Sequence, residues 1–407
     1  MRNVRDYAIV TAAYWAFTLT DGALRMLVLL HLHDRGYEPL EIASLFLFYE
    51  FFGVVTNLFG GWLGARVGLK LTLFAGLALQ VFACAMLAAE PEWLVLPYVM
   101  AAQGLSGVAK DLTKMSSKSY VRLVVPDEDR GRLMRWVAVL TGSKNALKGV
   151  GFFLGGASLA AFGFRATCAG LAAVLVVTLV ASMRGLPAAP GRAASKVSLR
   201  HIVSSDPRIN WLSAARLFLF GSRDVWFVLA LPLYLTVERA WSHPAVGAFL
   251  ALWVIFYGVV QGSAPHWVGG ARATAPPDAR RLMRWTLLLL LPTAAVGGAL
   301  SLGLDSSATL VTGLAAFAAV FASSSAIHSY LIVSYADRGR VALNVGFYYM
   351  ANASGRLVGT LLSGAVYQAA GEGRTGLVAC LAVSLAFVAA SAALCAPLRG
   401  AERRGAA

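Results

Sequence analysis

The sequence predicts an all-α polytopic membrane protein with twelve transmembrane helices in two pseudo-symmetric six-helix halves. Three features predict this fold: the composition, a succession of long apolar runs, and an internal repeat. Of the 407 residues, 58% are hydrophobic and 14% are charged, whereas soluble proteins carry about 25% charged residues. The chain also contains 40 glycines, and small residues allow helices to approach closely in a membrane.

Twelve apolar runs have the length of about 20 residues that a bilayer core about 30 Å thick requires. The first six are expected at 7–31, 39–63, 70–89, 93–117, 136–160 and 166–183. The second six are expected at 209–236, 244–268, 284–304, 308–333, 341–369 and 375–397. The chain would then divide into an N-terminal half (1–183), a cytoplasmic linker (184–208), a C-terminal half (209–398) and a short cytoplasmic tail (399–407).

The distribution of basic residues predicts the orientation in the membrane. A net charge of +15 could belong to a nucleic-acid-binding protein, but most of the basic residues lie in the short segments between apolar runs. Cytoplasmic segments are enriched in Lys and Arg, and the expected outer segments contain only Arg35, Arg165, Arg239 and Arg374. We therefore expect both termini in the cytoplasm, a lipid bilayer as the surroundings, and no binding of nucleic acid.

The two halves repeat each other in sequence. Asp129-Arg130-Gly131-Arg132 recurs as Asp337-Arg338-Gly339-Arg340, and at the same spacing Lys148 corresponds to Arg356. The pairs Gly151 with Gly359 and Gly156 with Gly364 follow the same spacing. Two such repeats predict a substrate site at their interface, near the middle of the membrane.

This architecture resembles the major facilitator superfamily. The stretch from Gly61 to Lys70 is similar to the signature of that superfamily between its second and third helices, although Ala65 replaces the usual Asp. The resemblance implies a gating loop that contains Gly61, Arg66, Gly68 and Lys70. In the fifth run, Gly142, Gly151, Gly155 and Gly156 are spaced similarly to a glycine motif of the superfamily's antiporters, except that Gly156 replaces a Pro. Plain helix packing explains these glycines equally well.

Ionisable residues inside the apolar runs indicate the substrate, because a charge in the membrane is costly and is usually functional. The acidic candidates for proton or charge coupling are Asp21, Glu50, Asp111 and Asp224. The basic candidates for substrate binding are more numerous and comprise Arg25, Lys110, Lys144, Lys148, Arg216, Arg223 and Arg356. The surplus of positive charge predicts a small anionic substrate. These residues lie on runs 1, 2, 4, 5, 7 and 11, which line the cavity in the fold that the chain resembles.

Two of the basic residues, Lys144 and Lys148, are one helical turn apart and so share a face. Two like charges at this spacing repel each other, so an anion held between them explains the pair. Alternatively, each lysine pairs with a carboxylate on another helix. Arg25 and Arg223 lie on runs 1 and 7, where the organophosphate antiporters of the superfamily also place one Arg each.

Other classes of function find no support in the sequence. The four cysteines, Cys84, Cys168, Cys380 and Cys395, lie in runs 3, 6 and 12 and form no CxxC pair, so no metal site is expected. HExxH, GxSxG and phosphate-binding P-loop motifs are absent from the sequence. We therefore expect a transporter that has no cofactor, and not an enzyme.

Several stretches resemble one family in particular, the ArsJ-type organoarsenical efflux permeases. They are Tyr14-Trp15-Ala16-Phe17-Thr18-Leu19-Thr20-Asp21-Gly22-Ala23-Leu24-Arg25, Phe46-Leu47-Phe48-Tyr49-Glu50-Phe51-Phe52-Gly53, Ala109-Lys110-Asp111-Leu112, Thr141-Gly142-Ser143-Lys144-Asn145-Ala146-Leu147-Lys148-Gly149-Val150-Gly151 and Asn210-Trp211-Leu212-Ser213-Ala214-Ala215-Arg216-Leu217-Phe218-Leu219-Phe220-Gly221. The resemblance implies export of 1-arseno-3-phosphoglycerate, an arsenate ester of phosphoglycerate, across the bacterial inner membrane. A cytoplasmic glyceraldehyde-3-phosphate dehydrogenase would make this ester, and its export would confer arsenate resistance.

Another function within the same superfamily remains open, namely a general organic-anion, organophosphate or drug/proton antiporter. A membrane scaffold or sensor would be expected to carry a sizeable soluble domain, and the sequence has no stretch that predicts one. We expect the transporter to be a monomer.

Overall fold

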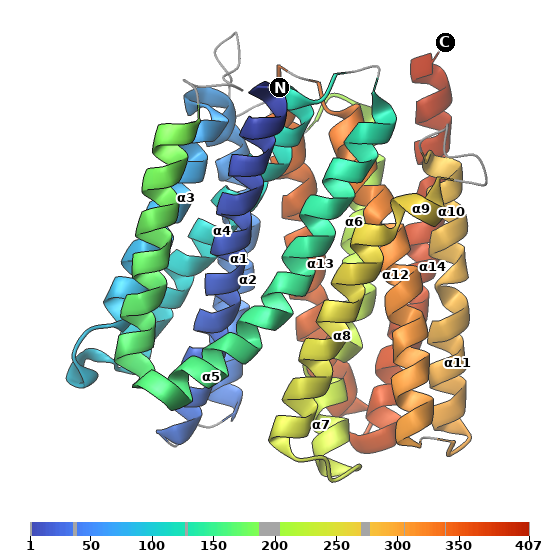
Figure 1. Cartoon of the computed structure of the whole chain (residues 1–407). Coiled ribbons are helices and arrows are strands. Elements are labelled where there is room, and N and C mark those ends of the chain that lie inside the picture. Colours follow the sequence, from blue (N-terminus) through green and yellow to red (C-terminus); the bar gives the residue numbers. More distant parts are fainter. Residues whose placement is uncertain are drawn as a thin grey trace.

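The computed structural model describes residues 2–35, 39–126, 129–186, 204–269, 277–304, 306–337 and 339–406. All regular structure in these residues is helical, as the long parallel rods of Figure 1 show. Both ends of the chain lie at the same end of the bundle (Figure 1). An all-α polytopic fold was predicted, and it is confirmed.

The first group of helices comprises α1 (Arg2–Asp34), α2 (Pro39–Val67), α3 (Leu69–Leu87), α4 (Leu96–Val124) and α5 (Arg130–Gly185), with a short 3-10 helix at Pro91–Trp93. The second group comprises α6 (Pro207–Phe227), α7 (Ala230–Val237), α8 (His243–Ser263), α9 (Pro265–Val268), α10 (Ala279–Leu288), α11 (Leu290–Ser301), α12 (Ser307–Tyr335), α13 (Val341–Ala369) and α14 (Gly373–Ala406). Most of the expected linker, 187–203, lies outside the described residues.

These elements correspond to the twelve expected spans. α5 contains both the fifth and the sixth, which meet at Gly163 in a backbone conformation with φ of 75° that favours glycine. The seventh, eighth and ninth spans each consist of two consecutive helices, α6 with α7, α8 with α9, and α10 with α11. The expected tail, 399–407, continues the last helix, because α14 extends to Ala406.

By length and composition alone, seven of the described helical segments are apolar enough to cross a membrane. The long helices α1, α2, α4 and α13 fall outside that set. Each of these four carries ionisable residues within its length, such as Asp21 on α1 and Arg356 on α13. Their polarity is therefore the first structural sign of a polar site inside the bundle.

The two groups of helices are joined most firmly at the end that carries the termini. One buried apolar cluster combines residues of α1 to α5 with residues of α6, α9, α10 and α14 and with those from Ala326 to Tyr349 of α12 and α13. A second cluster, from Leu219 to Val388, contains residues of the second group only. Arg122 Nε on α4 also donates to the carbonyl of Ala336 across the groups at 3.3 Å.

Glycines allow the groups to approach closely. A Cβ on Gly61 of α2 would lie 2.8 Å from the carbonyl oxygen of Ala342 and 3.0 Å from the Cα of Gly346 on α13. A Cβ on Gly142 of α5 would lie 2.6 Å from the carbonyl oxygen of Gly258 on α8. Within the first group, Gly151 of α5 packs in the same way against α1, where a Cβ would lie 2.5 Å from the carbonyl oxygen of Leu19.

Candidate functional site

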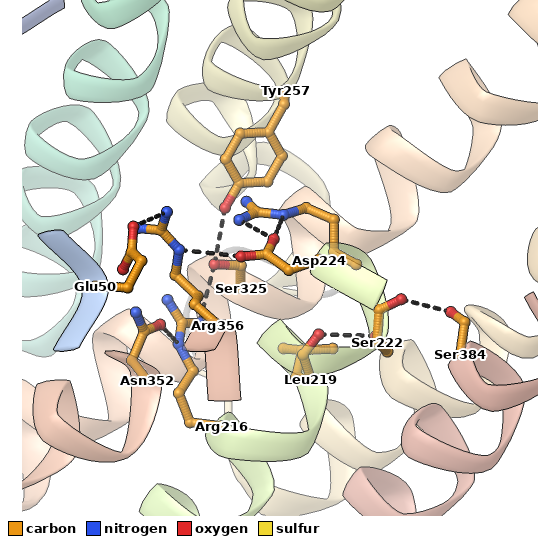
Figure 2. A network of polar contacts seen from close by, with 11 residues as sticks. Glu50, Arg216, Leu219, Ser222, Asp224, Tyr257, Ser325, Asn352, Arg356 and Ser384 are labelled. Carbon is orange, nitrogen blue, oxygen red and sulfur yellow. Dashed lines mark hydrogen bonds and ion pairs between the residues drawn. The ribbon is translucent and has the colours of Figure 1, made fainter. Parts of the chain in front are cut away.

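The candidate site is built around Arg356, which lies in the middle of α13 and contacts both groups of helices. Its NH2 donates to Oε1 of Glu50 on α2 at 2.5 Å, and its Nε donates to Oδ2 of Asp224 on α6 at 3.1 Å. Figure 2 shows the guanidinium between the two carboxylates. Arg356 thus joins residues that are 306 and 132 positions away in the sequence.

Asp224 holds a second guanidinium. Arg223 Nε donates to its Oδ1 at 2.6 Å, so the Asp224 carboxylate is shared by Arg223 and Arg356. The Asp224 side chain is 1% exposed, whereas that of Arg356 is 24% exposed. A buried charge is stable only when it is paired and hydrogen-bonded, and Asp224 meets that condition through two arginines.

Arg216 lies on α6, two turns before Asp224, and is held by an amide and a hydroxyl. Its Nε donates to Oδ1 of Asn352 at 2.8 Å and its NH1 donates to Oγ of Ser325 at 3.0 Å. Its guanidinium carbon also lies 3.9 Å from the centre of the Phe220 ring. Ser325 accepts further hydrogen bonds from Tyr257 and Gln261 of α8, at 3.1 and 3.0 Å.

The lysines of α4 surround Asp111. Lys110 Nζ lies 3.7 Å from Oδ2 of Asp111, and Lys114 donates to Oδ1 of the same carboxylate. Lys118, one turn further along, donates to the hydroxyl of Tyr349 on α13, so it crosses between the groups. Tyr349 also lies under Lys114, with 4.6 Å from Nζ to the ring centre. The α4 lysines are thus held by one carboxylate, Asp111, and by the ring and hydroxyl of Tyr349.

Lys144 and Lys148 on α5 are different. Both are partly exposed, and within the described residues neither forms a hydrogen bond or an ion pair with a carboxylate. The charges that act on Lys148 are those of Arg25, Asp21, Lys144 and Arg356, three of which are positive. The arrangement in which each lysine pairs with a carboxylate on another helix is therefore not seen in the described part of the chain.

Asp21 and Arg25 belong to the same region. Asp21 on α1 is buried and acts electrostatically on both Lys144 and Lys148. Arg25 acts on Glu50 as well as on Lys148. The structure thus gathers the predicted residues of α1, α2, α4, α5, α6 and α13 into one charged region.

The predicted gating loop is almost entirely helical. Gly61 and Arg66 lie within α2, and Arg66 covers the ring of Trp62 at 5.3 Å. Only Gly68, with φ of 98°, separates α2 from α3. Lys70 donates to the carbonyl of Leu186 at 2.6 Å. This stretch therefore ties α3 to the end of α5, and Gly61 packs against α13.

Several polar residues of the site were not predicted from the sequence. They are Asn352, Tyr257, Gln261, Asn145 and Tyr349. Asn145 donates to Oε1 of Gln261 at 2.6 Å and so links α5 to α8. Neutral polar residues are common in membrane helices as interhelical hydrogen-bond partners, so their residue type alone gave no signal. Of these residues, only Asn145 was indicated by its position, because it lies between Lys144 and Lys148 in the sequence.

Comparison with known proteins agrees with this geometry. A family model described as Major Facilitator Superfamily matches residues 10–274, well over half of the chain. The chain belongs to the major facilitator superfamily. It is therefore a multi-pass membrane transporter. No curated protein matches its sequence closely enough to serve as a relative.

Solved structures of this superfamily share the fold along nearly the whole chain. The human organic anion transporter MFSD10 (TETRAN) has a TM-score of 0.73 at 17% identity, over 96% of this chain and 99% of its own. A bacterial homologue of the iron transporter ferroportin in an outward-facing state has a TM-score of 0.73 at 16% identity, over 97% and 99%. A variant of the E. coli fucose:proton symporter FucP has a TM-score of 0.68 at 14% identity, over 94% and 97%.

Proposed function

We propose that this transporter exports a small, multiply charged oxyanion from the cytoplasm by alternating access of its two groups of helices. The observation that carries the proposal is the pair Lys144 and Lys148, which form no ion pair within the described residues and lie near Arg25 and Arg356. Unneutralised cations in a membrane interior are costly. An oxyanion that binds them removes that cost, and arginine adds bidentate recognition of phosphate-like groups.

The substrate that we propose is 1-arseno-3-phosphoglycerate. The proposal rests on the resemblance of stretches in α1, α2, α5 and α6 to the ArsJ-type permeases, together with the cationic character of the site. The ester carries an arsenate and a phosphate group, and both are hard oxygen anions that suit Arg and Lys. The four described cysteines are buried on α3, α5 and α14, and the oxyanion that we propose does not need the thiolate ligands that trivalent arsenic prefers.

The cellular setting follows from that substrate. A glyceraldehyde-3-phosphate dehydrogenase would supply the ester, and the transporter would act as a monomer in a bacterial inner membrane with both termini in the cytoplasm. The scarcity of Lys and Arg in the expected outer segments supports this orientation. The position of both termini at one end of the bundle agrees with it (Figure 1).

Transport into everted membrane vesicles tests the substrate directly. Glyceraldehyde 3-phosphate labelled with ³²P would be incubated outside the vesicles with NAD⁺, arsenate and the dehydrogenase, so that the ester forms at the cytoplasmic face. We expect ³²P to accumulate in vesicles that contain the transporter, because hydrolysis inside leaves labelled 3-phosphoglycerate. Accumulation that is equally large without arsenate and without the dehydrogenase would favour the second candidate, a general organic-anion or organophosphate antiporter, and MFSD10, which shares the fold, is an organic anion transporter.

Two variants test the site. We expect Lys148→Ala and Arg356→Ala to raise the KM for the ester about tenfold or more, because each removes a charge-assisted contact to the anion. Arsenate resistance of cells that express each variant at wild-type level gives a second measurement. The control is Arg165→Ala, which removes an exposed arginine paired with Glu90 at 2.6 Å, outside the site. Wild-type resistance and KM in both site variants would contradict the assignment.

A further inference from the structure

Glu50 holds an unusual position among the four acidic residues of the site. It is the carboxylate that the first group of helices supplies to Arg356, at 2.5 Å from NH2. The Glu50 side chain is 6% exposed, while that of Arg356 is 24% exposed. Arg356 is therefore partly exposed while its carboxylate partner is buried.

The cations around Glu50 are the same residues that we assign to substrate binding. Arg356, Lys110, Arg25 and Lys148 all act on it electrostatically, and all are positive. Asp111 is bound by neighbours on its own helix. Asp224 is bound by Arg223 on its own helix and by Arg356, so Glu50 is the partner of Arg356 that comes from the other group of helices. Glu50 is thus an anionic group of the protein held by the cations of the binding site.

We propose that Glu50 is an internal substitute for the transported anion, which holds Arg356 while the site is empty and is displaced from it when the anion binds. This inference rests on the proposed function, since it names the competition that decides which anions bind. It assigns to Glu50 a role in specificity and in the return step, and not a role as a proton carrier.

The first consequence concerns the class of substrate. When a monoanion replaces Glu50 beside Arg356, one negative charge takes the place of another, so little binding free energy is gained. A dianionic oxyanion brings more charge and can accept two parallel hydrogen bonds from the guanidinium. The site therefore selects solutes with at least one dianionic group, such as a phosphate or arsenate ester.

The second consequence concerns the empty transporter. When the two groups rock past each other, the basic residues pass through a closed state, and a buried cation without a partner is strongly unfavourable. In that state Glu50 supplies a negative charge to the basic residues around it, in addition to the Asp224 carboxylate that pairs with Arg356. The empty protein can then return, so that efflux proceeds without an anion carried in the opposite direction.

Binding to the purified full-length protein tests the first consequence, with 3-phosphoglycerate as the dianionic probe and glycerate as its monoanionic counterpart. In the wild-type protein we expect measurable affinity for 3-phosphoglycerate only. Glu50→Gln should lower the Kd for 3-phosphoglycerate about tenfold and should bring glycerate into the measurable range. Glu50→Asp keeps the charge but has a shorter side chain, so its Kd for 3-phosphoglycerate should lie between the values of the wild type and of Glu50→Gln.

The matched control is Glu90→Gln, because Glu90 also pairs with an arginine, Arg165, but at an exposed position outside the site. We expect its Kd values to equal those of the wild type. If Glu50→Gln does not fold, Glu50→Asp, which retains a negative charge near Arg356, tests the competition by its Kd for 3-phosphoglycerate. An unchanged or weaker affinity for 3-phosphoglycerate in the Glu50 variants that fold would overturn the inference.

Proteoliposomes loaded with ³²P-labelled 3-phosphoglycerate test the second consequence. Net efflux into buffer without anion should fall at least tenfold in Glu50→Gln, while exchange against external unlabelled 3-phosphoglycerate should persist. Equal loss of net efflux and of exchange would indicate a structural role for Glu50 and would refute its role as a substitute for the anion. A wild-type protein that binds and transports neither this probe nor the arsenate ester would instead refute the proposed function itself.

Discussion

At the scale of single residues, the structure distinguishes two ways of keeping a cation inside the bundle. Arg223 and Arg356 share the carboxylate of Asp224. Arg216 is held by an amide, a hydroxyl and an aromatic face. The planar fork of arginine makes these three contacts at once, which a lysine cannot do.

Arg216→Lys should therefore destabilise the protein although the charge is kept. We expect a loss of about 1–3 kcal/mol in the free energy of unfolding, because the hydrogen bonds to Asn352 and Ser325 cannot both be made by one ammonium. Thermal unfolding of the detergent-purified protein measures this. Arg165→Lys, at an exposed ion pair, is the control and should change stability by less than about 1 kcal/mol. Equal unfolding temperatures for the two variants would contradict the assigned role of Arg216.

At the scale of elements, glycines decide how closely the helices meet. Gly142 on α5 faces Gly258 and Gly262 on α8, so the two backbones touch without side chains between them. Gly151 and Gly155 likewise lie against the backbone of α1. Gly142, Gly151 and Gly155 are thus closely packed in this structure, whereas the site of Gly156 is more open, with Leu30 at 3.9 Å from a Cβ placed there.

Gly142→Ala should separate α5 from α8, because its Cβ would lie 2.6 Å from the carbonyl oxygen of Gly258 and cannot be relieved by a side-chain rotation. Overpacking of this kind costs about 1–3 kcal/mol. We expect a lower unfolding temperature and reduced transport. Gly364→Ala on α13 is the matched control, since nothing lies within 4 Å of its Cβ. That variant should be neutral or slightly stabilising, because alanine favours the helix. A stable and active Gly142→Ala protein would show that the contact is not needed.

At the scale of the whole molecule, the two groups of helices are closed against each other at the end that carries the termini. The mixed apolar cluster, the contact of Lys118 with Tyr349 and the contact of Arg122 with Ala336 all lie toward that end. With both termini in the cytoplasm, as we propose, this structure is closed to the cytoplasm. Export then requires these contacts to separate and reform in each cycle.

A cross-link at this end should stop transport. A Cβ on Gly64 of α2 would lie 3.4 Å from the Cβ of Ala342 on α13, close to the separation of a disulfide. We expect oxidised Gly64→Cys/Ala342→Cys protein to lose vesicle transport and to recover it after reduction. The control pair is Gly297→Cys/Leu381→Cys, at 3.7 Å and within the second group; its oxidation should leave transport intact. Full activity of the oxidised Gly64→Cys/Ala342→Cys protein would rule out separation at this interface.

The sequence alone determined the class of fold, the approximate ends of the spans and the residue types of the candidate site. It could do so because a membrane span is set by the composition of one continuous segment, and because a charge inside such a segment is rare enough to be noticed singly. The same reasoning predicted the loop at 61–70 less well. The residues that precede Gly68 continue α2, and no local pattern indicated that the helix would extend so far.

Only the tertiary structure decided which charges meet. Glu50 and Arg356 are 306 positions apart, and their contact depends on which faces of α2 and α13 pack together. The close approach of Gly61 to Gly346 sets those faces. The same packing leaves Lys144 and Lys148 without an ion-pair partner in the described residues while Arg223 and Arg356 share Asp224. The sequence gives the number of charges along the chain. The electrostatic energy of a bound solute depends instead on its distances to charges on different helices, because that energy is set by separation in space.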